Sequence, residues 1–232
     1  LAPDGLLSDQ FGVSVSLSGD ASRALVGVHL DERPGITNGG TARVFLRAGT
    51  TWAQEAMLVV PDSANNDLLG SAVALSLDGT RALVGATGDD TPGGSQAGTA
   101  RVFLRTGTTW ASEATLLAAD GVLDDMLGGA VALSSDGSRA LVGAEQDDTA
   151  AGINAGSAHV FVRTGTTWTE EATLVAPDAL AGDFFGASVA LSSDGSRALV
   201  GVRGDDTVGG GDAGSARIFL RTGSTWMQEQ VL

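Results

Sequence analysis

The chain has 232 residues, of which 43% are hydrophobic, and it carries a formal net charge of −15 with no cysteine. This length and composition indicate a folded protein with a large apolar core, and the lack of cysteine excludes disulfides and thiolate metal sites. The acidic balance argues against nucleic acid as a partner, because phosphate binding depends on basic side chains. No apolar run approaches the roughly 20 residues needed to cross a bilayer, so we expect no membrane insertion. The chain begins at Leu1 without a signal-peptide pattern, and we therefore expect a processed or excised segment.

A period of 58 residues runs through the whole chain. The dipeptide Phe11-Gly12 is followed at this spacing by Leu69-Gly70, Leu127-Gly128 and Phe185-Gly186. A tryptophan series has the same spacing and consists of Trp52, Trp110, Trp168 and Trp226. The pattern predicts a single repeat domain over residues 1–232, with four units at 1–58, 59–116, 117–174 and 175–232.

Within each unit, apolar residues alternate with a period of two, which predicts strands. In the fourth unit the first strand is expected to begin at Phe185 and to alternate through Leu191, and Asp194-Gly195 then forms a tight turn. Further strands are expected over 197–202, over 215–221 after a glycine-rich loop, and over 226–232. Because the sequence shows neither helix caps nor a 3.6-residue pattern, each unit is predicted to be a four-stranded antiparallel meander.

A lone meander cannot bury both of its faces, so the units are expected to pack against one another. Four-stranded units repeated around an axis are typical of a β-propeller, whereas the coils of a β-solenoid, the alternative, are shorter. The predicted fold class is all-β, a β-propeller built of four 58-residue four-stranded antiparallel blades. An open arc would expose two apolar faces, which soluble proteins avoid. We therefore expect a ring that closes by itself or is completed by another chain or by further sequence.

The unit resembles the FG-GAP repeat, which forms the blades of integrin α-chain propellers and of many bacterial surface proteins. The resemblance rests on the Phe-Gly pair that opens the first strand, on Val-Gly-Ala at 84–86 and 142–144, and on a third strand of the form Gly-Ser-Ala-x-Val-Phe. It covers all four units. The resemblance implies a propeller fold, an extracellular or cell-surface location and a role in adhesion.

Two features depart from that family. Its usual calcium loop is an Asp-rich series between the first and second strands, but each unit here has one carboxylate at that place: Asp20, Asp78, Asp136 and Asp194. Because calcium takes about six to eight oxygen ligands, the family calcium sites are not expected in this chain. Integrin-type propellers also close with seven blades, whereas four units are present here.

Acidic residues gather in two sets of loops. In an up-and-down blade, the loops between the second and third strands and the loops between units emerge on one face, and they hold 19 of the 28 acidic residues but only two of the 13 arginines. This acidic loop face, with a net charge of −17, is expected to attract cations or a basic partner, or to serve solubility alone. The candidate ligand-binding residues on it are Asp9, Asp67, Asp125 and Asp183.

The loops between the second and third strands contain paired carboxylates. The pairs are adjacent aspartates in three units and Asp31-Glu32 in the first. Their repetition favours a structural or multivalent role over catalysis, which normally needs one distinct site, so no catalytic residue is predicted. With loop carbonyls the pairs are candidate ligands for Ca²⁺, the only cofactor considered. The candidate metal set is Asp31, Asp89, Asp90, Asp147, Asp148, Asp205 and Asp206.

Histidine chemistry is not expected. His29 and His159 do not repeat, no nucleophile motif accompanies them, and without cysteine they do not make a zinc ligand set. His159 occupies the position of Arg43, Arg101 and Arg217, on a strand face that we expect to be exposed.

Several repeated residues are expected to be structural. The tryptophans favour packing between blades, with stacking on sugars as the alternative. Arg23, Arg81, Arg139 and Arg197 are expected to pair with the turn Asp or with the Glu of the fourth strand. The structural set is Phe11, Gly12, Phe185, Gly186, Trp52, Trp110, Trp168 and Trp226.

These observations favour a non-enzymatic, extracellular or cell-surface propeller module for adhesion, assembly or ligand binding through the acidic loop face. The expected partners are a protein or glycan at the cell surface, or further copies that complete the ring. Two alternatives are a lectin with repeated sites between blades, with or without calcium, and a purely structural unit of a longer array or fibre.

Overall fold

The computed structural model describes residues 8–207 and 210–232, so residues 1–7 of the first predicted unit and 208–209 of the fourth lie outside it. Every regular element in the described ranges is a β-strand. The first sheet contains β1 (Val15–Leu17), β2 (Arg23–Val28), β3 (Thr41–Ala48) and β4 (Thr51–Leu58). The second contains β5 (Leu69–Leu75), β6 (Arg81–Ala86), β7 (Thr99–Thr106) and β8 (Thr109–Leu116). The third contains β9 (Ala130–Leu133), β10 (Arg139–Ala144), β11 (Ser157–Thr164) and β12 (Thr167–Leu174). The fourth contains β13 (Phe185–Leu191), β14 (Arg197–Val202), β15 (Ser215–Thr222) and β16 (Thr225–Val231).

Each sheet is an antiparallel meander in chain order, which confirms the predicted all-β blades with a 58-residue period. The third and fourth strands of every blade contain a β-bulge at the same place, for example between Val102 and Phe103 in β7. A bulge increases the local twist of a strand pair. The repeated bulge therefore gives all four blades the same twist, so that they can stack in one register.

The predicted alternation along the first strand is interrupted near its start. Phe185 pairs with Val202, but the next residue of β13 with a partner is Ser188, which pairs with Gly201. Gly186 adopts a φ of 94°, a backbone conformation that favours glycine. Because two residues, Gly186 and Ala187, lie between these pairs, Phe185 remains on the same face as Val189, which pairs with Val200, and Phe185 is fully buried.

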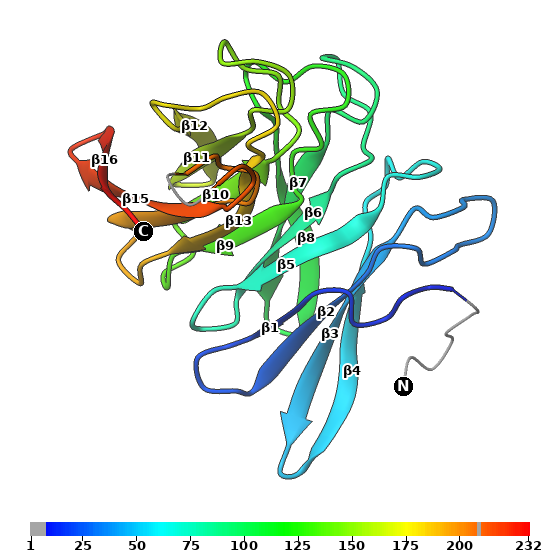
Figure 1. Cartoon of the computed structure of the whole chain (residues 1–232). Helices are drawn as coiled ribbons and strands as arrows, with labels where there is room; N and C mark the ends of the chain where they lie inside the picture. Colours follow the sequence, from blue (N-terminus) through cyan, green and yellow to red (C-terminus); the bar gives the residue numbers. More distant parts are fainter. Residues whose placement is uncertain (1–7, 208–209) are drawn as a thin grey trace.

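The blades stack side by side through their inner strands. β5 contacts β1, β2 and β3 of the blade before it, and the same arrangement continues as β9 contacts β5 and β6 and β13 contacts β9, β10 and β11. Figure 1 shows the four sheets as a fan, with the blade of β1–β4 and the blade of β13–β16 at opposite ends. Closure of the ring within one chain, which was one expected arrangement, is not seen among the described residues. The chain forms an open arc of propeller blades.

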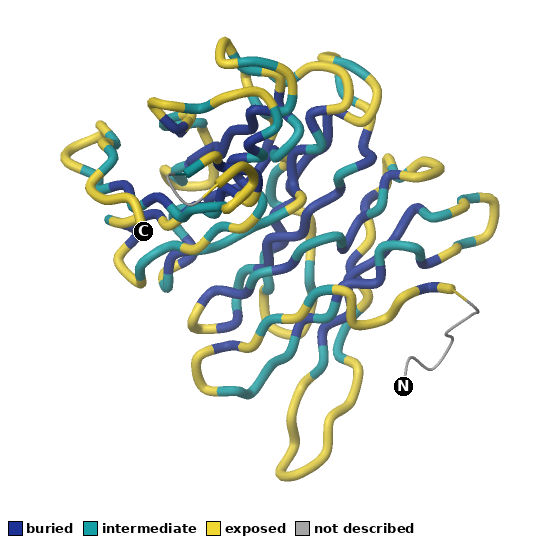
Figure 2. The backbone as a smooth tube through the Cα atoms, in the orientation of Figure 1, coloured by how far each residue is buried: buried dark blue, intermediate teal, exposed yellow. Residues whose placement is uncertain are grey.

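The hydrophobic core lies between successive blades rather than within one sheet. In the first interface Leu25 and Val44 of the first blade pack with Leu69, Val84 and Phe103 of the second. Equivalent clusters occupy the second and third interfaces. Figure 2 shows the buried backbone where the sheets face one another and exposed backbone at the hairpin tips.

Two glycines of the repeat allow the close approach of neighbouring blades. A Cβ atom added to Gly85 of the second blade would lie 1.9 Å from the carbonyl oxygen of Gly128 in the third. Gly128 itself has a φ of 104°, and its amide donates to the carbonyl of Gly143 at 3.0 Å. The recurring Phe-Gly and Val-Gly-Ala elements are therefore the two sides of one backbone contact.

Backbone hydrogen bonds also join the blades at both ends of the inner strands. On one side the amide of Leu127 donates to the carbonyl of Ala97 in the preceding blade at 3.0 Å. On the other side the amide of Leu77 donates to the carbonyl of Ser135 in the following blade at 2.9 Å. These bonds set the register between successive repeats. Among the described residues no helix is long and apolar enough to cross a membrane.

Candidate functional site

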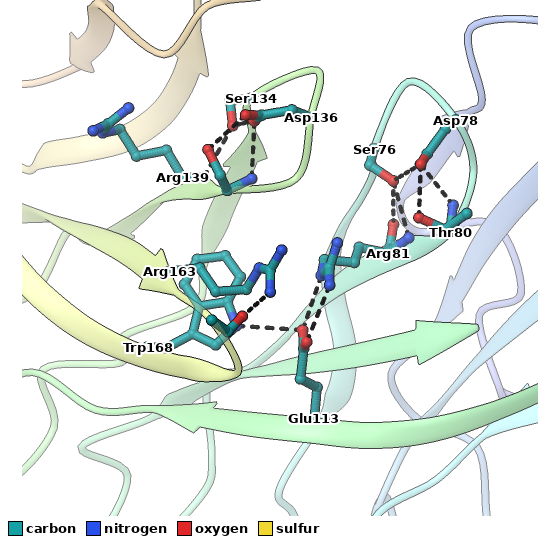
Figure 3. Close-up of polar contacts among 12 residues, drawn as sticks. Ser76, Asp78, Thr80, Arg81, Glu113, Ser134, Asp136, Arg139, Arg163 and Trp168 are labelled. Atoms are coloured by element: carbon teal, nitrogen blue, oxygen red, sulfur yellow. Dashed lines mark hydrogen bonds and ion pairs between the residues drawn. The ribbon is translucent and has the colours of Figure 1, made fainter. Parts of the chain in front are cut away.

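A buried glutamate joins each blade to the next. Glu113 on β8 receives hydrogen bonds from Arg81 of its own blade, with Nε at 3.0 Å, and from the indole Nε1 of Trp168 in the third blade at 3.3 Å. Figure 3 shows Glu113 between these two side chains. Burial alone would raise the pKa of Glu113, but the bonds from Arg81 and Trp168 outweigh it and lower the pKa. We refer to this unit of Glu, Arg and Trp as the blade clasp.

The first and third interfaces contain the same clasp with one more arginine. Glu55 accepts from Arg23 of its own blade at 3.0 Å, and from Arg105 at 2.7 Å and Trp110 at 3.2 Å in the second blade. Although burial opposes it, these bonds lower the pKa of Glu55 to about 2. Glu171 has equivalent partners in Arg139, Arg221 and Trp226.

The expected pairing of the second-strand arginines with the fourth-strand glutamates is therefore confirmed. It occurs in all four blades, with N–O distances of 3.0, 3.0, 3.4 and 2.9 Å for Arg23–Glu55, Arg81–Glu113, Arg139–Glu171 and Arg197–Glu229.

The first aspartate of each carboxylate pair is buried inside its blade. Asp89 accepts from the hydroxyl of Thr99 at 2.7 Å and from Nη2 of Arg101 at 2.5 Å. The corresponding aspartates of all four blades are only 5–8% exposed: Asp31, Asp89, Asp147 and Asp205. These carboxylates have partners within their own blades and do not face solvent.

The arginines that bind these aspartates are buried, although we expected them to be exposed. Arg43, Arg101 and Arg217 were expected on an exposed strand face together with His159, but their exposed fractions are 2%, 6%, 2% and, for His159, 1%. The reason is electrostatic, because each guanidinium reaches the buried aspartate of the neighbouring loop. A buried charge is tolerated only when it is paired and hydrogen-bonded.

The second aspartate of each pair is exposed and shapes its own loop. Asp90 accepts from the backbone amide of Gln96 at 2.9 Å, Asp148 from that of Asn154 at 2.8 Å, and Asp206 from that of Asp212 at 2.9 Å. Side chains that accept from nearby amides in this way stabilise turns. The two members of a pair therefore have separate partners, one inside the blade and one within the loop.

The four candidate ligand-binding aspartates are also buried, which differs from their expected place on the acidic loop face. Asp9, Asp67, Asp125 and Asp183 are 4%, 4%, 2% and 3% exposed. The last three accept from backbone amides three residues earlier at 2.6–2.7 Å. Burial raises the pKa of Asp67 and Asp183, and it raises that of Asp125 to about 6. Their carboxylates hold the loops between blades.

The turn between the first and second strands does not fit calcium. Asp78 accepts from the Ser76 hydroxyl at 2.7 Å and from the Thr80 amide at 2.9 Å. Its oxygens are thus used within the turn, and it is the one carboxylate there. A single carboxylate supplies far fewer oxygens than calcium needs.

The third blade contains a cluster of three possible metal ligands that was not predicted from the sequence. One donor atom from each of Asp120, His159 and Glu170 lies within 4.8 Å of the others. These residues come from the loop before β9, from β11 and from β12. The signal in the sequence was His159 at a position where the other blades have arginine, but nothing in the sequence placed Glu170 beside it.

The two ends of the arc expose surfaces that are buried between blades elsewhere. The C-terminal face consists of Leu199, Ala216, Ile218, Glu229 and Leu232. Leu199 is 38% exposed and Leu232 is 67% exposed. The equivalent residues of the other blades are at most 3% exposed: Leu25, Leu83 and Leu141 for Leu199, and Leu58, Leu116 and Leu174 for Leu232.

The N-terminal face is the opposite half of the same interface. It consists of Phe11, Val26, Phe45, Arg47 and Trp52, and most of these residues line a shallow depression. Phe11 is 39% exposed and Trp52 is 43% exposed. The residues equivalent to Phe11 in the other blades are fully buried: Leu69, Leu127 and Phe185.

Each end face also carries half of a blade clasp. Glu229 continues the glutamate series and pairs with Arg197, and its side chain is 38% exposed, compared with 6–7% for the three clasp glutamates. Trp52 and Arg47 hold the positions of the tryptophan and arginine that reach back to a preceding blade. The ends therefore carry matching apolar and polar groups.

Comparison with known proteins identifies the repeat family and the fold. No curated protein matches the chain in sequence. Among solved structures, hydrazine synthase of Kuenenia stuttgartiensis is similar with a TM-score of 0.59 and 13% identity. The alignment covers 100% of this chain and 53% of that chain, so this chain spans about half the length of its structural neighbour. At this identity the similarity shows the fold alone.

The FG-GAP repeat matches the sequence four times, over residues 1–45, 52–103, 110–161 and 168–219. The matches have the 58-residue phase of the blades, and they contain the glycines that bring neighbouring blades into contact. The chain therefore belongs to the FG-GAP repeat family.

Proposed function

We propose that this chain is a non-enzymatic, extracellular or cell-surface assembly module that docks a second copy of itself end to end. The observation that carries the proposal is the match between its two end faces. The C-terminal face of one copy presents the surface that each inner blade offers to the blade after it. The N-terminal face of another copy presents the surface that normally receives it.

The apolar part of this contact supplies the driving force. Leu199 and Leu232 would enter the environment in which Leu25 and Leu58 are already buried. Full burial of a leucine stabilises a contact by roughly 1.5–3 kcal/mol. Phe11 of the second copy would lie where Leu69 lies in the first interface. Continuity with three existing interfaces makes a further FG-GAP blade the partner that fits best.

The polar part gives the contact its register. Each clasp tryptophan lies 55 residues after its glutamate, as in Glu55 and Trp110. Continuing the series from Glu229 leads to Trp52 of the next copy, with Arg47 in the place of Arg105. Truncating or moving one partner of such a pair leaves a charge without compensation, so a shifted register is disfavoured.

The other roles considered have less support. A lectin that uses the tryptophan series would need exposed ring faces, but Trp110, Trp168 and Trp226 pack against the cores between blades and donate to glutamates of the preceding blade. Calcium at the paired aspartates would have to displace the partners that each carboxylate has. Catalysis by these pairs is disfavoured because they repeat in successive blades.

Association in solution tests the proposal. Sedimentation velocity of the chain over a wide concentration range is expected to show dimers and longer species that dissociate on dilution. The change Trp52→Ala should weaken association, because it removes an apolar contact and a clasp donor. Ile153→Ser is the matched control, since Ile153 is 68% exposed in a loop away from both end faces. A monomer at every concentration contradicts the proposal.

A charge exchange tests the register. Glu229→Arg and Arg47→Glu should each weaken self-association. Mixed together, the two variants should associate in alternation, because the exchanged Arg and Glu attract each other at one contact and the unchanged Arg47 and Glu229 meet at the other. Failure of the mixture to associate, while the unchanged chain does, would show that the copies meet through other surfaces.

A further inference from the structure

Among residues 8–207 and 210–232, two blades contain a buried cation between two carboxylates. In the second blade, Nη1 of Arg101 lies 3.0 Å from Asp62 and Nη2 lies 2.5 Å from Asp89. In the fourth blade, Arg217 bridges Asp178 and Asp205 at 2.5 and 2.7 Å. The side chains of Arg101 and Arg217 are 7% and 2% exposed. Each guanidinium compensates the two negative charges that flank it.

The third blade keeps the carboxylates but lacks the guanidinium. Asp120 and Asp147 hold the positions of Asp62 and Asp89, whereas His159 holds that of Arg101. Glu170 adds a third carboxylate at a position where the other blades have Gln54, Ser112 and Gln228. The pocket therefore has three acids and one imidazole. Even with a protonated imidazole its charge is more negative than that of the pocket around Arg101.

The hydrogen bonds of His159 direct one ring nitrogen toward the acids. Nε2 lies 2.8 Å from the Ser157 hydroxyl, which is itself hydrogen-bonded to Asp147. Because an ionised carboxylate only accepts, Ser157 donates to Asp147 and accepts from Nε2–H of His159. The lone pair of Nδ1 then faces Oε1 of Glu170 at 2.7 Å. Two acceptors at this distance repel each other unless they share a proton or move apart to bind one metal ion.

The surroundings supply further ligand atoms for a metal ion at this point. Asp120 is exposed and reaches the same point from the loop before β9, so a ligand enters from solvent. The Thr173 hydroxyl lies 3.0 Å from Oε1 of Glu170 and adds a polar group at the rim. A ligating histidine usually donates its other ring N–H to a carboxylate or another acceptor. The chain from His159 through Ser157 to Asp147 provides this arrangement.

We propose that Asp120, His159 and Glu170 bind one divalent first-row transition metal ion of the zinc class, which replaces the guanidinium found in the other blades. Imidazole nitrogen and carboxylate oxygen are both ligand atoms that zinc accepts, and water would complete the four positions. The nitrogen ligand makes calcium less suitable, since calcium prefers oxygen alone. The ion joins β11, β12 and the loop that leads from the second blade into the third.

Zinc titration of the metal-free chain by calorimetry tests the site. The unchanged chain is expected to bind one Zn²⁺ and to gain thermal stability with it. His159→Arg recreates the arrangement around Arg101 and should fold without metal, bind no zinc at this site and show no zinc-dependent shift in melting temperature. His29→Ala is the matched control, because it removes the other histidine and should leave binding unchanged.

A second pair of variants separates ligands from supporting residues. Glu170→Gln, which places the glutamine of the first and fourth blades in the third, should abolish binding. Ser157→Ala should weaken it by about 10- to 100-fold, as expected for a residue that orients a metal ligand. Cobalt in place of zinc should give visible absorption bands in the unchanged chain and in His29→Ala, but not in His159→Arg or Glu170→Gln. Absence of zinc binding by the unchanged chain, or equal binding by His159→Arg, overturns the proposal and leaves a protonated His159–Glu170 pair as the structural arrangement.

Discussion

Trp110 in the second blade donates its indole N–H to Glu55 in the first, with Nε1 and Oε2 3.2 Å apart. Glu55 also accepts from Arg23 and Arg105, and its side chain is 7% exposed. One carboxylate thus accepts from donors in two blades, and the donors of the second blade lie 50 and 55 residues after Glu55 in the sequence. The blade clasp adds polar bonds in fixed directions to an interface that is otherwise apolar.

Removing the carboxylate at an inner clasp should destabilise the fold more than at the open end. Glu55→Gln leaves two arginines without their partner, and hydrogen bonds to charged groups contribute about 1.5–3 kcal/mol. Glu229→Gln is the matched control, because its pair with Arg197 is exposed and such surface pairs contribute about 0–1 kcal/mol. Urea unfolding measures both free energies. Equal losses would show that the clasp adds nothing beyond an ordinary surface pair.

Acidification should remove the contribution of Glu55. Its pKa is lowered from 4.5 to about 2 in the folded chain, so the unfolded state binds the proton first as the pH falls. The stabilisation is complete above pH 4.5 and is lost as the pH falls toward 2. The difference in melting temperature between the unchanged chain and Glu55→Gln is therefore expected to shrink over this range. A difference that stays constant down to pH 2 would contradict the lowered pKa.

The contribution of Asp125 to stability should change with pH in the opposite direction to that of Glu55. Burial raises its pKa to about 6, so between its unfolded and folded values the native state holds the proton more tightly. Its contribution to stability therefore falls as the pH rises toward and through 6. Asp125→Asn is expected to stabilise the chain at pH 7–8 relative to its effect at pH 4. Melting curves at both pH values measure this.

Asp90→Asn provides the comparison for Asp125. The amide of Gln96 and the hydroxyl of Ser95 lower the pKa of Asp90, so its charged form is favoured in the folded chain. Asp90→Asn should therefore lower the free energy of unfolding at neutral pH. The same sign for the two variants at pH 7 would show that loop geometry, and not charge burial, determines their effects.

Alanine at an inner interface glycine should separate two blades. Gly85→Ala places a Cβ atom 1.9 Å from the Gly128 carbonyl, which is backbone and cannot rotate away. Overpacking of this kind costs about 1–3 kcal/mol or more. In the fourth blade the equivalent Gly201 is approached most closely by the Ser188 hydroxyl, so Gly201→Ala should be tolerated better. Comparable losses of unfolding free energy would mean that backbone contact between blades does not require glycine.

The repeated blade could be predicted from the sequence because its signals are local. A period of two identifies a strand whatever it packs against, and Asp-Gly marks a hairpin because these residues tolerate positive φ. The 58-residue period and the position of Phe-Gly at the first strand were therefore readable without a structure. The pairing of Arg81 with Glu113 was also predicted, since a meander places their strands in one blade.

The burial of the charged groups could not be predicted from the sequence in the same way. Arg101 and His159 lie on strands in which alternation distinguishes the two faces. Alternation does not show whether the face with the charged side chains is buried by other parts of the protein. A loop that folds back over the sheet brings Asp89 onto Arg101 and buries both. The acidic loop face expected from summed charges is correspondingly less acidic at its surface, because several of its carboxylates are inside the blades.

The sequence by itself determined the strands, the turns, the repeat and the family, since each depends on neighbours within about 58 residues. Only the tertiary structure decided that the blades form an open arc, that Glu229 and Trp52 lie on opposite ends of it, and that Asp120, His159 and Glu170 meet. The physical reason is that burial and charge compensation depend on which surfaces face one another. That is a property of the packed blades and not of any single repeat.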